Sequence, residues 1–78
     1  MMVRGLNMVK YDNIPHNMAA VTKIRYRDVG MESVISPVPG GAHVQFQHSV
    51  SSIAPGQSAV FYEGDDVIAG GIIQKEIK

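Results

Sequence analysis

The sequence predicts an all-β fold, a small antiparallel β-barrel of five to six strands. Short runs alternate between apolar and polar residues, as expected for strands with one buried face. Turns rich in glycine, proline, asparagine and aspartate separate these runs, and no clear helical pattern interrupts them. A fragment of a β-sandwich is the alternative, because the same pattern describes the strands of either architecture.

The chain has 78 residues, enough for one small domain. A domain of this size buries about 60% of the surface that its unfolded chain exposes, so we expect a thin core. There is no cysteine, which excludes a disulfide and a thiol nucleophile and fits a reducing cytoplasm. No apolar run approaches the ~20 residues needed to cross a bilayer, and the first residues lack a signal-like apolar region. We therefore expect a soluble, cytoplasmic protein with no membrane partner.

The N-terminal part is expected to form a leading strand at residues 4–10, where apolar residues alternate loosely. Residues 12–17 then interrupt the pattern, because asparagine, aspartate and proline favour turns. Pro15 also pushes Ile14 towards an extended conformation. We therefore place residues 1–17 ahead of the barrel, as a leading strand and linker or the end of a preceding domain, and residues 18–78 in the barrel.

Residues 18–27 have the two-residue period of a strand. One face carries Thr22, Ile24 and Tyr26, and the other carries Val21, Lys23, Arg25 and Arg27. A second strand is expected at residues 32–36, followed by a turn at residues 37–41, where two prolines and two glycines disfavour a central strand.

Residues 42–48 show the clearest alternation. The core set is Ala42, Val44, Phe46 and His48, and the solvated set is His43, Gln45 and Gln47. Residues 49–54 are expected to form a loop or one helical turn.

The C-terminal part predicts a hairpin. Pro55 and Gly56 suit the centre of a type II turn, which needs a positive φ at its second central residue. Residues 58–62 and 67–73 then pair across Gly64 and Asp65. The glycine pair at residues 70–71 is expected to mark a bulge or a barrel corner, where a side chain would clash.

No constellation indicates catalysis or a metal centre in this chain. Ser58 follows a glycine, but a strand instead of a helix follows it, so it is not a nucleophile elbow. The acidic residues 63, 65 and 66 are interpreted as a solvated turn. His43 and His48 lie on opposite faces of one strand, and His16 lies in the expected linker, so the histidines do not form a ligand set.

Lys23, Arg25 and Arg27 are the candidate RNA-binding residues. Alternate residues of a strand share a face at intervals of about 6.5–7 Å, close to the phosphate spacing of a nucleic-acid strand. Residues 1–30 hold five basic and two acidic residues, a net charge of +3, whereas residues 31–78 carry −3. The plain alternative is a solvated strand edge whose cations discourage aggregation.

Two blocks of sequence carry a resemblance to a known family. The first is Lys23-Ile24-Arg25-Tyr26-Arg27, and the second runs from Pro55-Gly56-Gln57 through Ala59-Val60-Phe61-Tyr62 to Gly64-Asp65. With the glycine-rich strand that follows, they resemble the C-terminal β-barrel of the bacterial tRNA-specific 2-thiouridylases (the tRNA 5-methylaminomethyl-2-thiouridylate synthase family). Asp28 stands where that family often has glutamine, and Ala69 replaces one of its glycines.

This resemblance implies a non-catalytic, translation-factor-like barrel that docks tRNA. The parent enzyme activates the anticodon wobble uridine with ATP and replaces its C2 oxygen with sulfur from a persulfide. Its adenylating loop and its two cysteines belong to an N-terminal domain and do not occur in this chain. The implied partners are tRNA, the catalytic and central domains of the same parent chain, and a sulfur-relay protein.

Two other functions stay open. The first is a structural module that packs on the catalytic domain without contacting RNA, through apolar faces near Phe61, Tyr62 and Val67. The second is a translation-factor-like barrel with an unrelated partner. Salt sensitivity separates RNA docking from apolar packing, because only phosphate binding weakens strongly with added salt.

Overall fold

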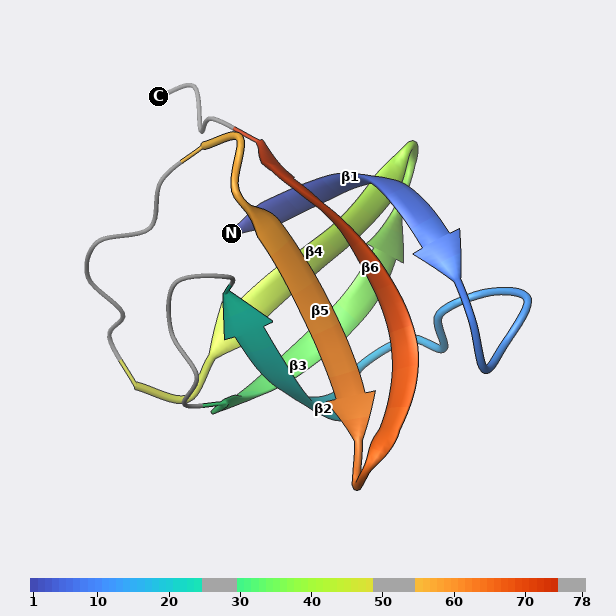
Figure 1. The fold of residues 1–78 in the computed structure, drawn as a ribbon, viewed down its shortest axis with the longest axis vertical. Helices are drawn as coiled ribbons and strands as arrows, with labels where there is room; N and C mark the ends of the chain where they lie inside the picture. Colours follow the sequence, from blue (N-terminus) through green and yellow to red (C-terminus); the bar gives the residue numbers. More distant parts are fainter. Residues whose placement is uncertain (25–29, 49–54, 75–78) are drawn as a thin grey trace.

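The computed structural model describes residues 1–24, 30–48 and 55–74. These residues form six β-strands: β1 (Met2–Met8), β2 (Met18–Ile24), β3 (Met31–Val38), β4 (Gly41–Phe46), β5 (Ser58–Glu63) and β6 (Asp66–Gln74). All neighbouring strands run antiparallel, and the order β1-β4-β3-β2-β5-β6 closes into a barrel because β6 also pairs with β1 (Figure 1). The predicted all-β barrel is confirmed, and closure excludes the open sandwich fragment. Among the described residues there is no helix that could span a membrane.

Strand β1 closes the barrel. Its Val3 lies opposite Ala42 of β4 and opposite Ile73 of β6, and the Val3 side chain is fully buried. We expected residues 1–17 to precede the barrel, but the structure places β1 within it, so the barrel begins at Met2 and not at Met18. Whether β1 belongs to the barrel depends on its pairing with the distant strands β4 and β6. The local turn signals at residues 12–17 carry no information about that pairing.

The connection between β1 and β2 folds back onto the barrel. The backbone N–H groups of Val9 and Lys10 both donate to the carbonyl of Ile68, at 2.9 and 3.2 Å. Ile14 is only 5% exposed and joins the hydrophobic core. The turn-rich stretch is therefore a packed connection of the same domain.

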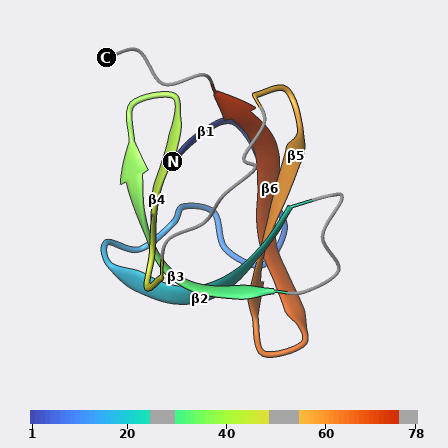
Figure 2. The same ribbon diagram turned by 90° about the vertical axis from the view of Figure 1, so that its left-hand side faces the viewer.

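The inward faces of the strands fill the barrel. The largest fully buried apolar side chains are Phe61, Ile35, Ile68, Ile73, Val3 and Val44. The alternation predicted for residues 42–47 is confirmed, because Ala42 and Val44 are buried whereas Gln45 is exposed. His48 lies beyond the end of β4 and is exposed, so its predicted place in the core set is wrong. The β3–β4 hairpin and the β5–β6 hairpin stand on opposite sides of this core (Figure 2).

Two hydroxyl groups lie inside the barrel. Thr22 of β2 and Ser33 of β3 are 0% and 2% exposed, and their side-chain oxygens are 2.7 Å apart. Ser33 donates its only hydroxyl proton to the Ala20 carbonyl at 2.9 Å, so Thr22 is the donor between the two hydroxyls. Both groups are therefore hydrogen-bonded, as buried polar groups must be to avoid a desolvation cost.

Two of the three predicted turns are found at their expected positions. Gly56 has a φ of 90°, as the second central residue of a type II turn requires. Strands β5 and β6 pair up to Glu63 and Asp66, with the two residues between them forming the turn. Pro37 lies opposite Ala42 within the β3–β4 ladder, so this turn is shorter than the predicted residues 37–41.

The glycine pair of β6 lies where β1 crosses closely. The register between β1 and β6 shifts between Arg4 and Asn7, opposite Gly71. A Cβ atom on Gly71 would lie 2.6 Å from the Cγ1 of Val3 and 2.7 Å from the Arg4 carbonyl oxygen. A Cβ atom on Gly70 would meet only the Ala59 carbonyl oxygen at 3.3 Å and a Val60 methyl group at 3.7 Å. The predicted clash is therefore confirmed at Gly71, and the bulge lies in β1.

Candidate functional site

Lys23 lies on the outer face of β2. Its neighbours Thr22 and Ile24 are buried, whereas Lys23 is half-buried and lies opposite Val60 of β5. The Lys23 Nζ lies 4.8 Å from the centre of the Tyr62 ring, a cation–π contact across the β2–β5 pair. The predicted outward face of Lys23 is confirmed.

The other two candidate RNA-binding residues, Arg25 and Arg27, lie outside the described residues, as do Tyr26 and Asp28. The three-cation stripe therefore stays a prediction, of which the structure places only Lys23.

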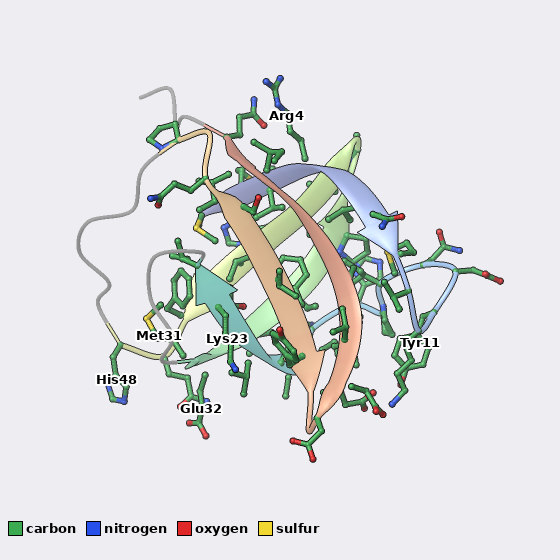
Figure 3. The ribbon with its side chains drawn as sticks, in the orientation of Figure 1. Arg4, Tyr11, Lys23, Met31, Glu32 and His48 are labelled. Atoms are coloured by element: carbon green, nitrogen blue, oxygen red, sulfur yellow. The ribbon has the colours of Figure 1, made fainter. Side chains whose placement is uncertain are left out.

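A carboxylate lies on the same side of the barrel as Lys23. Glu32 of β3 is exposed and lies opposite Val21 of β2. Figure 3 shows its side chain close to that of Lys23. A shallow hollow of about 220 Å³ separates β2 and β3 from the β5–β6 turn, and its lining includes Glu32, Gln47 and Tyr62. The negative charge of Glu32 weakens the positive potential around Lys23.

A second polar cluster joins the β1–β2 connection to the β5–β6 hairpin. Lys10 Nζ lies 2.9 Å from Glu63 Oε1 and 2.8 Å from Asp66 Oδ2. The Tyr11 hydroxyl donates to Glu63 Oε1 at 2.6 Å. We call Lys10, Tyr11, Glu63 and Asp66 the Lys10 cluster. Sequence analysis missed it, because Lys10 and Tyr11 lie more than fifty positions from Glu63 and Asp66 and no local pattern connects the two pairs.

The hydrogen bonds of the Lys10 cluster shift three pKa values. Bonds to Asp66 and then Glu63 raise the pKa of Lys10. The bond to Glu63 raises the pKa of Tyr11, and the bonds from Tyr11 and Lys10 lower the pKa of Glu63. Each shift favours the charge state in which these hydrogen bonds form. The Lys10 cluster therefore holds the β1–β2 connection against the β5–β6 hairpin. Because two carboxylates already neutralise the charge of Lys10, this side chain is a poor ligand for a phosphate.

Metal binding has no support in the ranges that the structure describes, where no three acidic or histidine side chains converge. The acidic hairpin was interpreted as a solvated turn, and the structure adds that two of its three carboxylates contact Lys10. His16, His43 and His48 are all exposed.

A hollow that no charged residue lines lies on the outer face of β1, β5 and β6. It measures about 380 Å³ and is lined by Gly5, Asn7, Val9, Ser58, Ala59, Val60, Val67, Gly70, Gly71 and Ile72. We call it the uncharged hollow. Of the predicted interface residues, Val67 lines it, Tyr62 lies half-buried on the outer face of the same hairpin, and Phe61 is fully buried inside the barrel. Phe61 is therefore a core residue, and its predicted place at an interface is wrong.

Comparison with known proteins gives a consistent result. The profile of the aminomethyltransferase β-barrel domain family matches residues 1–73. The chain is 47% identical over 79 aligned positions to the tRNA-specific 2-thiouridylase MnmA of Cytophaga hutchinsonii, covering all of this chain and 22% of that protein. It is 47% identical to the MnmA of Amoebophilus asiaticus and 40% identical to that of Chlorobium phaeobacteroides, covering 21% and 20% of those proteins. The chain thus spans about a fifth of the length of these relatives. No solved structure gives a significant match.

Proposed function

Because this chain belongs to the family of β-barrel domains that form the C-terminal part of tRNA-specific 2-thiouridylases, we propose that it is a tRNA-docking domain without catalytic residues. Its parent enzyme would be an ATP-dependent, cytoplasmic sulfurtransferase that thiolates the anticodon wobble uridine. ATP, the sulfur-relay protein and the catalytic cysteines would all belong to, or act on, the remaining domains.

The observation that supports docking is the outward position of Lys23 near the end of β2. Arg25 and Arg27 follow it in the sequence, and their place on the same face stays a prediction from the two-residue period. Sequence-independent affinity for RNA comes from cations that neutralise phosphates. Of the described cations, Lys10 is held by two carboxylates, and Arg4 lies on β1, across the barrel from β2. Figure 3 shows Arg4 and Lys23 far apart. Lys23 is therefore the described cation best placed for phosphate contact, and such contacts orient the tRNA without reading its bases.

The test is charge reversal in the full-length enzyme. The triple variant Lys23→Glu, Arg25→Glu, Arg27→Glu is expected to bind tRNA about tenfold more weakly or worse, because phosphate contacts turn into repulsion. The slope of log affinity against log salt concentration should become shallower by about one per lost phosphate contact. Barrel stability should change little, because Lys23 points outward.

The matched control is Arg4→Glu, which makes the same charge change as Lys23→Glu on the opposite side of the barrel. It should leave tRNA affinity nearly unchanged. Equal tRNA affinity and equal salt slope for the triple variant and the unaltered enzyme would contradict the docking role.

The alternative function is a structural module that positions the catalytic domain without contacting RNA. The uncharged hollow favours an apolar contact of this kind on one side of the barrel. Its salt dependence distinguishes it, since apolar packing does not weaken when salt is added.

A further inference from the structure

The residues that line the uncharged hollow are of the kind found where one protein surface packs against another. None of its ten lining residues carries a charge, although 18% of the chain is charged. Val9 and Ile72 at its margin are 63% and 40% exposed, and they are the exposed large hydrophobic residues of the described part of the chain. An uncharged hollow with exposed apolar side chains at its margin is a candidate surface for docking.

The floor of the hollow is backbone. Gly70 places no side chain on the outer face of β6, so a partner can approach the strand closely there. Val60 and Val67 supply methyl groups beside this floor. No cation lines the hollow, so it offers nothing to neutralise a phosphate. Its chemistry fits an apolar protein surface and does not fit RNA.

The location of the hollow indicates which protein surface covers it. In the relatives, about four fifths of the chain lie outside the matched part, which is their C-terminal part. In such a protein the preceding domains would join the barrel near the start of β1, where Met2 pairs with Gln74 of β6, two residues from Ile72, and with His43 of β4. Gly5 and Asn7 of β1 border the hollow itself. The preceding domains would therefore be tethered next to the hollow, where effective concentrations reach the millimolar range.

We propose that an apolar surface of the preceding domains of the parent enzyme packs into the uncharged hollow. This inference rests on the membership in a longer 2-thiouridylase and not on the RNA contact of Lys23. The barrel would then have two binding surfaces. The outer face of β2 would contact tRNA, and β1, β5 and β6 would pack against the preceding domains.

Thiol labelling tests this directly, because the barrel has no cysteine of its own. A chimera would carry this chain in place of the matched C-terminal part of the Cytophaga hutchinsonii relative. Ile72→Cys places a thiol at the hollow, and Ala19→Cys places one at an exposed position of β2, across the barrel from β1. Maleimide labelling rates at each site are read by peptide mass spectrometry, for the chimera and for the 78-residue chain alone.

The proposal predicts that attachment of the preceding domains slows labelling of the Ile72→Cys variant about tenfold or more, while the Ala19→Cys variant reacts at the same rate in both proteins. Equal rates for the Ile72→Cys variant in both proteins overturn it. Protection in the isolated chain that grows with its concentration, or protection that requires tRNA, also overturns it, because a second copy or RNA would then be the occupant. Binding of tRNA to the same chimera is measured separately, so that loss of tRNA binding with the hollow still protected counts against the proposed docking role alone.

Discussion

The ammonium group of Lys23 lies 4.8 Å from the centre of the Tyr62 ring, across the β2–β5 pair. The aromatic face holds the cation on the outer surface of the barrel and limits the rotamers of a long side chain. Lys23 and Tyr62 belong to the two sequence blocks that carry the family resemblance, so the contact connects these blocks. Lys23 is therefore oriented before any ligand arrives.

A double-mutant cycle measures this contact. Lys23→Met and Tyr62→Leu, alone and combined, should reveal a coupling of about 0.5–1 kcal/mol in the free energy of unfolding, the range for exposed cation–π pairs. Chemical denaturation of the four proteins gives the value. Strictly additive effects would mean that the ring does not hold the cation in solution.

The Lys10 cluster predicts a pH dependence of stability on both sides of neutrality. The pKa of Glu63 is lowered in the folded barrel, so its stabilising contribution is present above its unfolded pKa near 4.5 and is lost as pH falls through the lower folded value. The pKa values of Lys10 and Tyr11 are raised, so their contributions are present below about pH 10 and are lost as pH rises through the higher folded values.

Thermal unfolding of Lys10→Met across this pH range tests the cluster. The variant should lose less stability than the unaltered chain at both the acidic and the alkaline end. Asp65→Asn is the matched control, because Asp65 lies in the same turn and makes no ion pair or hydrogen bond within the described part of the structure. A pH profile of Lys10→Met that parallels that of the unaltered chain would show that the ion pairs do not form.

The buried hydroxyl pair predicts a rescue. Ser33→Ala removes the acceptor of the Thr22 hydroxyl and the donor to the Ala20 carbonyl, which should cost about 1–3 kcal/mol of unfolding free energy. Adding Thr22→Val removes the orphaned hydroxyl and should recover part of that loss. Urea denaturation of the single and double variants measures both steps, and a double variant less stable than Ser33→Ala would contradict this assignment.

The two adjacent glycines of β6 should respond differently to the same change. Gly71→Ala forces a methyl group against Val3 and the Arg4 carbonyl and should cost about 1–3 kcal/mol, as overpacking does. Gly70→Ala meets its nearest atom at 3.3 Å and should change the unfolding free energy much less. Denaturation midpoints of the pair decide this, and equal losses would mean that the crossing of β1 is looser than the structure indicates.

Short-range pattern was sufficient to predict much of this fold. The alternation at residues 42–47, the hairpin closed by Gly64 and Asp65, and the positive φ of Gly56 all depend on side-chain period or turn chemistry. The closure of the barrel by β1 and the Lys10 cluster depend on contacts between distant positions, which no local pattern encodes. Of the candidate site, the outward face of Lys23 was predictable from strand period, whereas its contact with Tyr62 required the β2–β5 register.

The central claim is that the outer face of β2 docks tRNA, and an NMR titration tests it most directly. The isotope-labelled 78-residue chain is titrated with an anticodon stem-loop RNA at low and at moderate salt. The account predicts amide shifts centred on Lys23, Arg25 and Arg27 that weaken with salt, and unshifted signals from Arg4 on the opposite side of the barrel. Shifts that gather at the uncharged hollow, or none at β2 while the barrel stays folded, would contradict it.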